Sequence, residues 1–291
     1  MKPPRFEYTV PRRTDEVVTL LAQHGDRAKV LAGGQSLVPL LNFRLAQPEV
    51  LVDVNRVAEL AYIRPVDSGL AFGALTRQHA VERAEAVRTR LPVVAEACRL
   101  IGHLPIRHRG TIGGSLAHAD PASELPAVMV ALEAEMMARG PTGPRTLRAD
   151  EFFTGVFSTA LEPDELLTEI RVRGLPPRTG SAFVEIARRP GDFAIVGIAA
   201  LITLDDASRV SRARLALCGV GPTPVRAHEA ERVLVGQRLE ARVVDAAAEM
   251  IVAATDPPSD IHASAAFRKK LARHVGRQAI ELAARRAGGG S

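Results

Sequence analysis

The chain is poor in cysteine, and this shortage excludes several kinds of protein. Cys98 and Cys218 are the only cysteines among 291 residues, which is too few for a disulfide framework. An ordinary two-iron cluster needs twice as many thiolates, so any iron–sulfur centre is expected on another chain. Both cysteines lie in apolar stretches, and this favours buried core residues over ligands.

Aromatic side chains and long apolar runs are also scarce. Aromatic residues make up 4% of the chain, tryptophan is absent, and the net charge of +5 comes mainly from arginines spread along the whole sequence. Nucleic-acid binding calls for clustered positive charge with stacking aromatics, so it is disfavoured. No stretch approaches the roughly 20 apolar residues of a membrane span, and Met1–Arg5 leads into Glu7 rather than an apolar signal core. We therefore expect a cytoplasmic protein with no membrane span.

What the chain does contain favours two domains. Its apolar content of 46% can form a substantial core at this length. Prolines and glycines between Gly174 and Gly180 stop regular structure, so we predict domains at 1–176 and 177–287. The second is expected to be a three-stranded sheet with a helical layer. Its predicted strands are Ser181–Arg188, Ile195–Leu204 and Val210–Gly219, and its predicted helices are Arg226–Val235, Glu240–Ala254 and Ala263–Arg286.

Two glycine-rich stretches in the first domain have the composition of phosphate-binding loops. The first, Ala32-Gly33-Gly34-Gln35-Ser36, follows a predicted strand, Lys29–Leu31, and precedes a predicted helix, Leu37–Leu41, with Ser36 as N-cap. A strand, a glycine turn and a helix start together offer free N–H groups to an anion.

The second stretch, Thr111-Ile112-Gly113-Gly114-Ser115, is expected to be a loop between the predicted helix Leu91–Ile101 and a helix that begins near Ser123. Two such loops suit a diphosphate, held by their backbone amides and by the hydroxyls of Ser36, Thr111 and Ser115. Either stretch alone could be a structural turn. Neither a dinucleotide fingerprint after a strand nor a P-loop motif occurs, so a Rossmann site is disfavoured.

In order and separation, these stretches resemble the two FAD-pyrophosphate loops of the FAD-binding medium subunits of molybdenum hydroxylases, the aerobic carbon monoxide dehydrogenase and xanthine dehydrogenase group. The resemblance covers nearly the whole chain and includes Arg188–Ala194 and a closing helix with Phe267-Arg268. It implies an α+β fold: a two-part FAD-binding domain of the vanillyl-alcohol-oxidase (PCMH) type, then the C-terminal domain of carbon monoxide dehydrogenase flavoproteins.

The resemblance also implies which residues bind the cofactor. The set is Ala32, Gly33, Gly34, Gln35, Ser36, Thr111, Ile112, Gly113, Gly114, Ser115, Glu124 and Phe193. Glu124 would accept hydrogen bonds from ribose hydroxyls, and its alternative role is that of a first-turn acid on a helix. Phe193 would lie beside the isoalloxazine, and its alternative is a core residue at a strand start. Glu185 departs from the pattern, because many relatives have lysine there.

No catalytic residue and no metal ligand is predicted on this chain. His103, His108 and His118 surround the second stretch, but they are not spaced as ligands on one helix and no serine occupies a nucleophile elbow. We interpret them as solvated or loop-packing residues. Arg107 and Arg109 are interpreted as cations that attract the cofactor.

We therefore predict an FAD-binding electron-transfer subunit of a molybdenum-containing oxidoreductase. The resemblance implies a small partner subunit with [2Fe-2S] clusters, a large subunit with the molybdopterin cofactor, a dimer of heterotrimers and an external electron acceptor. Two alternatives stay open: a self-contained FAD-dependent oxidase or dehydrogenase acting on a small organic substrate, and a flavin-free interaction protein. The sequence leaves the substrate of the complex and the acceptor open.

Overall fold

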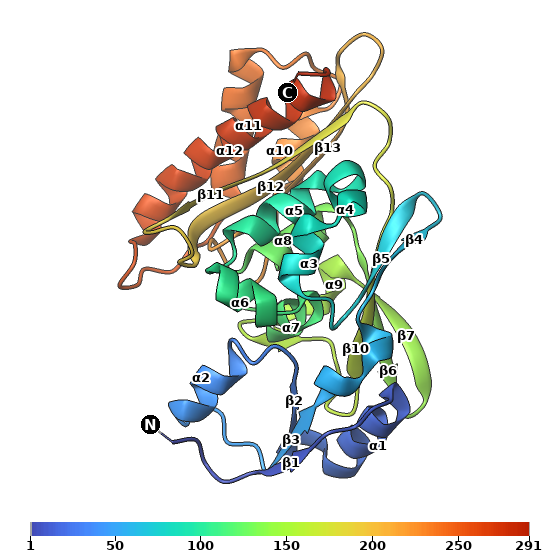
Figure 1. The fold of residues 1–291 in the computed structure, drawn as a ribbon. Helices are drawn as coiled ribbons and strands as arrows, with labels where there is room; N and C mark the ends of the chain where they lie inside the picture. Colours follow the sequence, from blue (N-terminus) through green and yellow to red (C-terminus); the bar gives the residue numbers. More distant parts are fainter. Residues whose placement is uncertain (1, 291) are drawn as a thin grey trace.

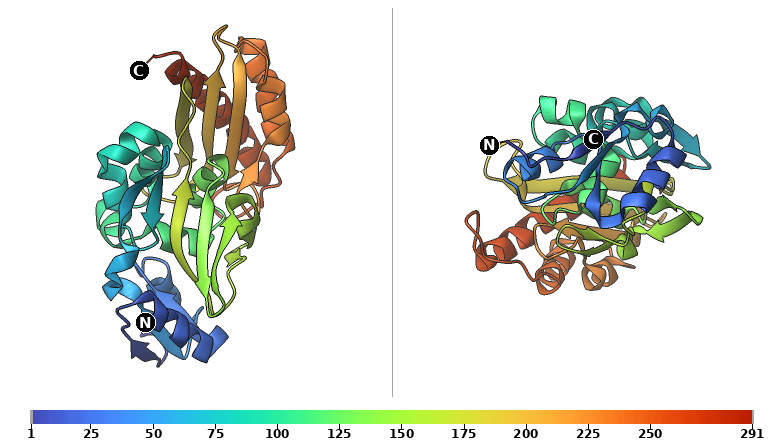
Figure 2. Two further views of the ribbon diagram at one scale, coloured as in Figure 1. Left: turned by 90° about the vertical axis from the view of Figure 1, so that its right-hand side faces the viewer. Right: turned by 90° about the horizontal axis from the view of Figure 1, so that it is seen from below.

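The computed structural model describes residues 2–290 as three bodies arranged along one axis. A small N-terminal sheet lies at one end of an elongated molecule, and a C-terminal sheet with its helices lies at the other (Figures 1 and 2). A five-stranded sheet and a group of short helices lie between them (Figure 1). The predicted α+β fold is confirmed.

The N-terminal sheet is parallel and has the order β1-β3-β2, from β1 (Glu7–Thr9), β2 (Ala28–Leu31) and β3 (Val50–Asp53). Helix α1 (Thr14–His24) buries an apolar stripe, and it ends at Gly25, which has a φ of 52°. Thr14 is the first helical residue, and its hydroxyl and amide both donate to the Glu59 carboxylate.

The middle body is an antiparallel sheet with the order β4-β5-β10-β6-β7. Its strands are β4 (Ile63–Val66), β5 (Gly69–Gly73), β6 (Glu135–Gly140), β7 (Gly143–Arg148) and β10 (Leu166–Val172). The helices beside it are α3 (Gln78–Arg83), α4 (Glu85–Arg90), α5 (Pro92–Leu100), α6 (Leu104–Arg109), α7 (Ile112–His118), α8 (Glu124–Ala131) and α9 (Ala149–Phe152). A small hairpin pairs β8 (Phe153–Gly155) with β9 (Ser158–Thr159).

The C-terminal sheet contains the three predicted strands, β11 (Thr179–Ala187), β12 (Ala194–Leu204) and β13 (Val210–Cys218). A two-residue strand, β14 (Val225–Arg226), adds a fourth that is too short to show a sequence period. Helices α10 (His228–Leu234), α11 (Ala241–Ala253) and α12 (Ala265–Ala287) cover one face, and α5 and α8 cover the other (Figure 1). Strand β12 is therefore buried on both faces, which explains its continuous apolar run.

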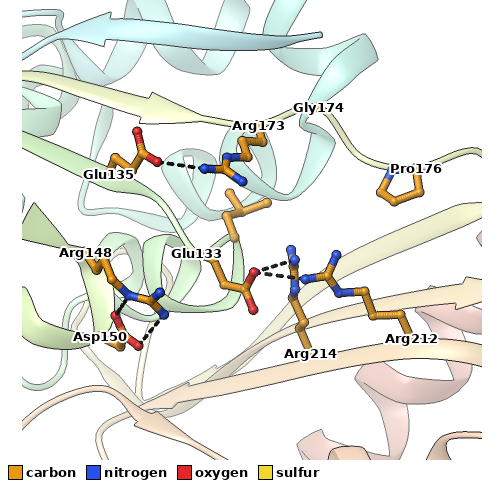
Figure 3. Close-up of a pocket in the computed structure, with 10 residues that line it drawn as sticks. Glu133, Glu135, Arg148, Asp150, Arg173, Gly174, Pro176, Arg212 and Arg214 are labelled. Carbon is orange, nitrogen blue, oxygen red and sulfur yellow. Dashed lines mark hydrogen bonds and ion pairs between the residues drawn. The ribbon is translucent and has the colours of Figure 1, made fainter. Parts of the chain in front are cut away.

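Charged side chains join the middle body to the C-terminal sheet. Glu133, in the turn between α8 and β6, accepts from Arg212 and Arg214 of β13 at 3.0 and 2.6 Å, and from Arg226 of β14 at 2.9 Å. Figure 3 shows the first two arginines beside Glu133 at the edge of a cavity of about 220 Å³. We call this contact region between the middle body and the C-terminal sheet the seam. Because Arg214 is only 9% exposed, its buried positive charge needs the Glu133 carboxylate as a partner.

Candidate functional site

The first glycine-rich stretch forms a turn between a strand and a helix, as predicted, and its binding of an anion stays a prediction. It leaves β2 and enters α2 (Leu37–Asn42), and the amides of Gly33–Ser36 donate no hydrogen bond within residues 2–290. Gly34 at φ 73° takes the left-handed conformation that such a turn needs. Ser36 occupies the N-cap position but its side chain makes no capping bond, so its hydroxyl is not committed to the helix.

The second stretch is different from the prediction, because it is the first turn of a helix rather than a loop. Thr111 is the N-cap of α7, and its hydroxyl accepts from the Gly114 amide at 3.0 Å. The amides of Ile112, Gly113 and Ser115 donate to the carbonyls of Thr76, Ala74 and Thr111. The expectation of free amides at 112–115 is therefore wrong. This stretch offers hydroxyl groups and the start of a helix instead.

The two stretches do lie side by side, as two parts of one site must. A Cβ built on Gly33 would lie 2.4 Å from the Arg109 carbonyl oxygen and 2.8 Å from the Gly110 Cα. A Cβ built on Gly114 would lie 3.8 Å from the Ala32 Cβ. Glycine at position 33 is thus required by close contact between the two backbones, in addition to any ligand.

The first glycine-rich stretch is held by a polar network that the sequence did not indicate. The Asn55 amide donates to the Ala32 carbonyl at 2.8 Å, and Arg77 donates to the Asn55 side chain at 2.6 Å and to the Arg109 carbonyl. Burial and the neighbouring Arg109 charge lower the pKa of Arg77. Arg77 therefore adds a cation beside both stretches. Its sequence neighbourhood is unremarkable, and only the tertiary contacts reveal the role.

Glu124 lies deeper than expected for a ribose ligand. It is the first residue of α8 and is 3% exposed. Burial raises its pKa to about 8, and the nearby charges of Glu185 and Asp120 act in the same direction. Glu185 faces the same seam from β11: its Oε2 is buried without a partner in residues 2–290, and burial raises its pKa to about 7. The ribose contact of Glu124 stays a prediction.

Phe193 is 58% exposed in the turn between β11 and β12, so its alternative role as a core residue is wrong. The turn reaches across to the middle body: a Cβ built on Gly191 would lie 2.7 Å from the His103 imidazole, just before α6. Helix α6 ends at Arg109, which contacts Gly33. The β11–β12 turn, α6 and α2 therefore lie along one side of the molecule (Figure 1).

The histidines and cysteines that the sequence analysis considered pack against other side chains or are buried. The His108 ring packs on His79 at 4.1 Å, and the His118 ring on Phe157 at 5.0 Å, between centroids. Residues 2–290 hold no group of three metal-ligating side chains. Cys98 and Cys218 are buried and free, as predicted, and burial raises the pKa of both thiols. Within the same range, no helix is both long and apolar enough to cross a bilayer.

A free-amide turn after a parallel strand, a capped helix start against it and an exposed aromatic turn from the C-terminal sheet lie along one side of the molecule, an arrangement typical of proteins that bind a nucleotide cofactor. Comparison with known proteins identifies the family. The family described as the FAD binding domain in molybdopterin dehydrogenase matches residues 4–173, and the CO dehydrogenase flavoprotein C-terminal domain matches residues 181–283. The chain belongs to the FAD-binding medium subunits of molybdenum hydroxylases.

Individual relatives agree over almost the full length. The alpha subunit of the 6-hydroxypseudooxynicotine dehydrogenase complex of Paenarthrobacter nicotinovorans is 44% identical, over 99% of this chain and 97% of that protein. Among solved structures, carbon monoxide dehydrogenase from Hydrogenophaga pseudoflava has a TM-score of 0.95 at 41% identity, covering 97% of this chain and 98% of that chain. Quinoline 2-oxidoreductase from Pseudomonas putida 86 has a TM-score of 0.93 at 36% identity, covering 99% of both chains.

Proposed function

We propose that this chain carries electrons between subunits of a molybdenum hydroxylase. In this proposal its FAD receives electrons from the [2Fe-2S] clusters of a small partner subunit and delivers them to an external acceptor. Substrate oxidation takes place on a large subunit that holds the molybdopterin cofactor. The observation that carries the proposal is the turn of four uncommitted amides at Gly33–Ser36, in a chain whose only cysteines are buried.

The residues of the turn fit a diphosphate by their chemistry. Four adjacent N–H groups have no acceptor within residues 2–290, and each hydrogen bond to a charged group contributes about 1.5–3 kcal/mol. The hydroxyls of Ser36, Thr111 and Ser115 can add donors, and Arg77 and Arg109 add positive charge. FAD, when bound, supplies one- and two-electron redox chemistry that no amino-acid side chain provides.

Phe193 has a different task in this proposal. Its exposed ring projects from the C-terminal domain on the side of the molecule that bears the phosphate-binding turn. A phenyl face can cover a flavin ring and exclude water, and it carries no proton to transfer. This suits electron transfer, and it explains why no acid–base pair is needed nearby.

The proposal places the iron–sulfur clusters on another subunit. The two cysteines are buried and burial raises the pKa of both thiols, so they are unsuited to ligate a cluster, and in this proposal the electrons arrive from a partner subunit. Assembly with a small iron–sulfur subunit and a large molybdenum subunit, as a dimer of heterotrimers, completes the enzyme. The named relatives act on different compounds, so the substrate and the final acceptor are left to experiment.

A rapid-mixing experiment tests the proposal. The FAD-loaded chain is mixed with its reduced iron–sulfur partner, and flavin absorbance is followed by stopped flow. We expect rapid bleaching in the complex and no turnover of organic substrates by the chain alone. An oxidised flavin in a verified complex, together with substrate oxidation by the isolated chain, would favour the self-contained oxidase. A purified chain that binds no flavin would favour the interaction protein.

A further inference from the structure

A buried arginine on α12 stands out among the charged residues of the C-terminal domain. Arg268 is 5% exposed, and its Nη1 donates to the carbonyls of Ile195 and Gly219 at 2.6 and 3.1 Å. Its Nη2 donates to the Asp260 carboxylate at 2.6 Å. Asp260 is itself held by the amides of His262 and Ala263, at 2.9 Å each.

These contacts meet where the Phe193 turn rejoins the sheet. Ile195 lies two residues after Phe193, at the beginning of β12. Gly219, just after β13, is packed so tightly that a Cβ would lie 2.4 Å from the Ile195 carbonyl oxygen. The Gly219 amide donates to the Pro121 carbonyl at 2.8 Å, and Pro121 follows α7. The Arg268 guanidinium group and the Gly219 amide therefore connect the Phe193 turn to the segment that follows α7.

Packing alone does not account for an arginine at this position. Its Nε is buried without a partner in residues 2–290, and its one carboxylate partner is partly exposed. Desolvating a guanidinium group under such conditions costs stability, and an apolar side chain would fill the same space at less cost. An apolar residue, however, could not donate hydrogen bonds to the carbonyls of Ile195 and Gly219.

We propose that Arg268 is a positioning residue that fixes the Phe193 turn against the flavin. The inference rests on the proposed function, and it adds a residue that lies far from the glycine turn in sequence. The turn contacts the middle body through Gly191 at His103, while β11 and β12 shift register at Ile186 and Ala187 and positions 188–190 are exposed, so the bond from Arg268 to the Ile195 carbonyl fixes the end of the turn that follows Phe193. Without the guanidinium group, Phe193 would sample several positions over the ring.

Partial burial alone would raise the pKa of Asp260, but the bonds from Arg268 and from the two amides hold it at about 2. A carboxyl whose folded pKa is depressed keeps its charge until the pH falls toward that value. The ion pair between Arg268 and Asp260 is therefore intact throughout the neutral pH range. Changes caused by losing it should be independent of pH between about 5 and 8.

The test compares two arginines of the same helix in the FAD-loaded chain. Arg268→Gln removes the bonds to Ile195, Gly219 and Asp260, whereas Arg273→Gln removes an exposed ion pair on the same helix, to Glu249 of α11 at 2.7 Å. FAD content, flavin reduction potential, visible circular dichroism and the rate of reoxidation by oxygen are measured for both. Hydrogen exchange of residues 188–194 reports the turn directly. Arg268→Lys, which keeps a charged donor, serves as the rescue.

We expect Arg268→Gln to retain FAD, to exchange faster at 188–194, and to change the visible dichroism and the reoxidation rate severalfold, in the direction of Phe193→Ala. Arg273→Gln should match the wild type, and Arg268→Lys should lie between. Wild-type flavin properties in Arg268→Gln, while Phe193→Ala changes them, would overturn this inference alone. A wild-type chain without flavin would overturn the proposed function and this inference with it. If Arg268→Gln does not fold, Asp260→Asn decides by the same measurements.

Discussion

Single residues at the site are constrained by neighbouring protein as much as by a ligand. Gly33 faces the backbone at Arg109 and Gly110, and Gly34 needs its left-handed φ. Glu124 is buried at the start of α8, where a charged carboxylate is unfavourable. All three residues are predicted from the sequence to contact FAD, and the structure adds an internal reason for each. Two predictions separate these roles.

We expect Gly33→Val to abolish FAD binding while the far end of the molecule stays folded. The valine Cβ would meet the Arg109 carbonyl oxygen at 2.4 Å, so the two stretches would have to separate and the amide turn would be lost. Flavin absorbance and circular dichroism measure the two effects. Gly155→Ala is the control, since its Cβ meets only the Ser158 Cβ at an ordinary 3.8 Å. Full flavin occupancy in Gly33→Val would refute the amide-turn site.

Glu124 should make the flavin-free chain less stable as the pH rises. Because its folded pKa of about 8 lies above the ordinary value of 4.5, the folded state binds a proton that the unfolded state releases. Stability is therefore greatest below the ordinary pKa and falls until the pH passes about 8. We expect Glu124→Gln to flatten this fall and to raise the free energy of unfolding at pH 8–9 by roughly 1–3 kcal/mol.

Urea unfolding across the pH range checks this prediction. Glu229→Gln is the matched control, because Glu229 is an exposed glutamate paired only with Arg232 on α10. A wild-type stability that stays level between about pH 5 and 8 would mean that Glu124 is ionised in the folded chain, contrary to its burial.

At the scale of elements, the main difference from the prediction concerns α7. A helix of seven residues with two glycines near its start has little intrinsic propensity, so the sequence favours a loop. Tertiary contacts override that preference. The Thr111 side chain caps the helix, and the carbonyls of Ala74 and Thr76 accept the amides of Gly113 and Ile112. Gly113 is glycine because a Cβ would lie 2.5 Å from the Ala74 Cβ.

Thr111→Val should therefore weaken both the helix start and the cofactor site. Loss of the cap costs about 1 kcal/mol of stability. Loss of a hydroxyl donor to a charged phosphate should weaken FAD binding by roughly tenfold or more. Thr111→Ser keeps the oxygen and should restore most of both effects. Thermal unfolding of the apo chain and flavin titration measure them separately. A Val variant with wild-type FAD affinity would remove Thr111 from the binding set.

At the scale of the whole molecule, the seam between the two parts decides how the site is assembled. Phe193 comes from the C-terminal domain and the amide turn from the N-terminal one. Their relative position depends on the packing of α5 and α8 under the C-terminal sheet and on ion pairs at the seam. The division at 176/177 remains a prediction, although a long shared interface argues that the two parts unfold together.

Glu133→Gln tests that interface. It would leave Arg212, Arg214 and Arg226 without their shared carboxylate, and Arg214 is buried. Since the Glu133 side chain is 34% exposed, we expect a moderate loss of about 1–3 kcal/mol rather than that of a fully buried pair. Urea unfolding monitored in both domains should also become less cooperative. Glu229→Gln should change little, and equal effects from the two variants would contradict the seam's importance.

The sequence by itself determined the three long strands and three helices of the C-terminal domain and the positions of the two glycine-rich stretches. These depend on local patterns: apolar periodicity, glycines at turns and the spacing between motifs. Only the tertiary structure decided which amides are free, because Ala74 and Thr76 accept from the second stretch and nothing accepts from the first within residues 2–290. It also placed Asn55 and Arg77 behind the turn, and it buried Glu124 beside Glu185. Hydrogen-bond partners and desolvation are set by residues distant in sequence, so no local pattern contains them.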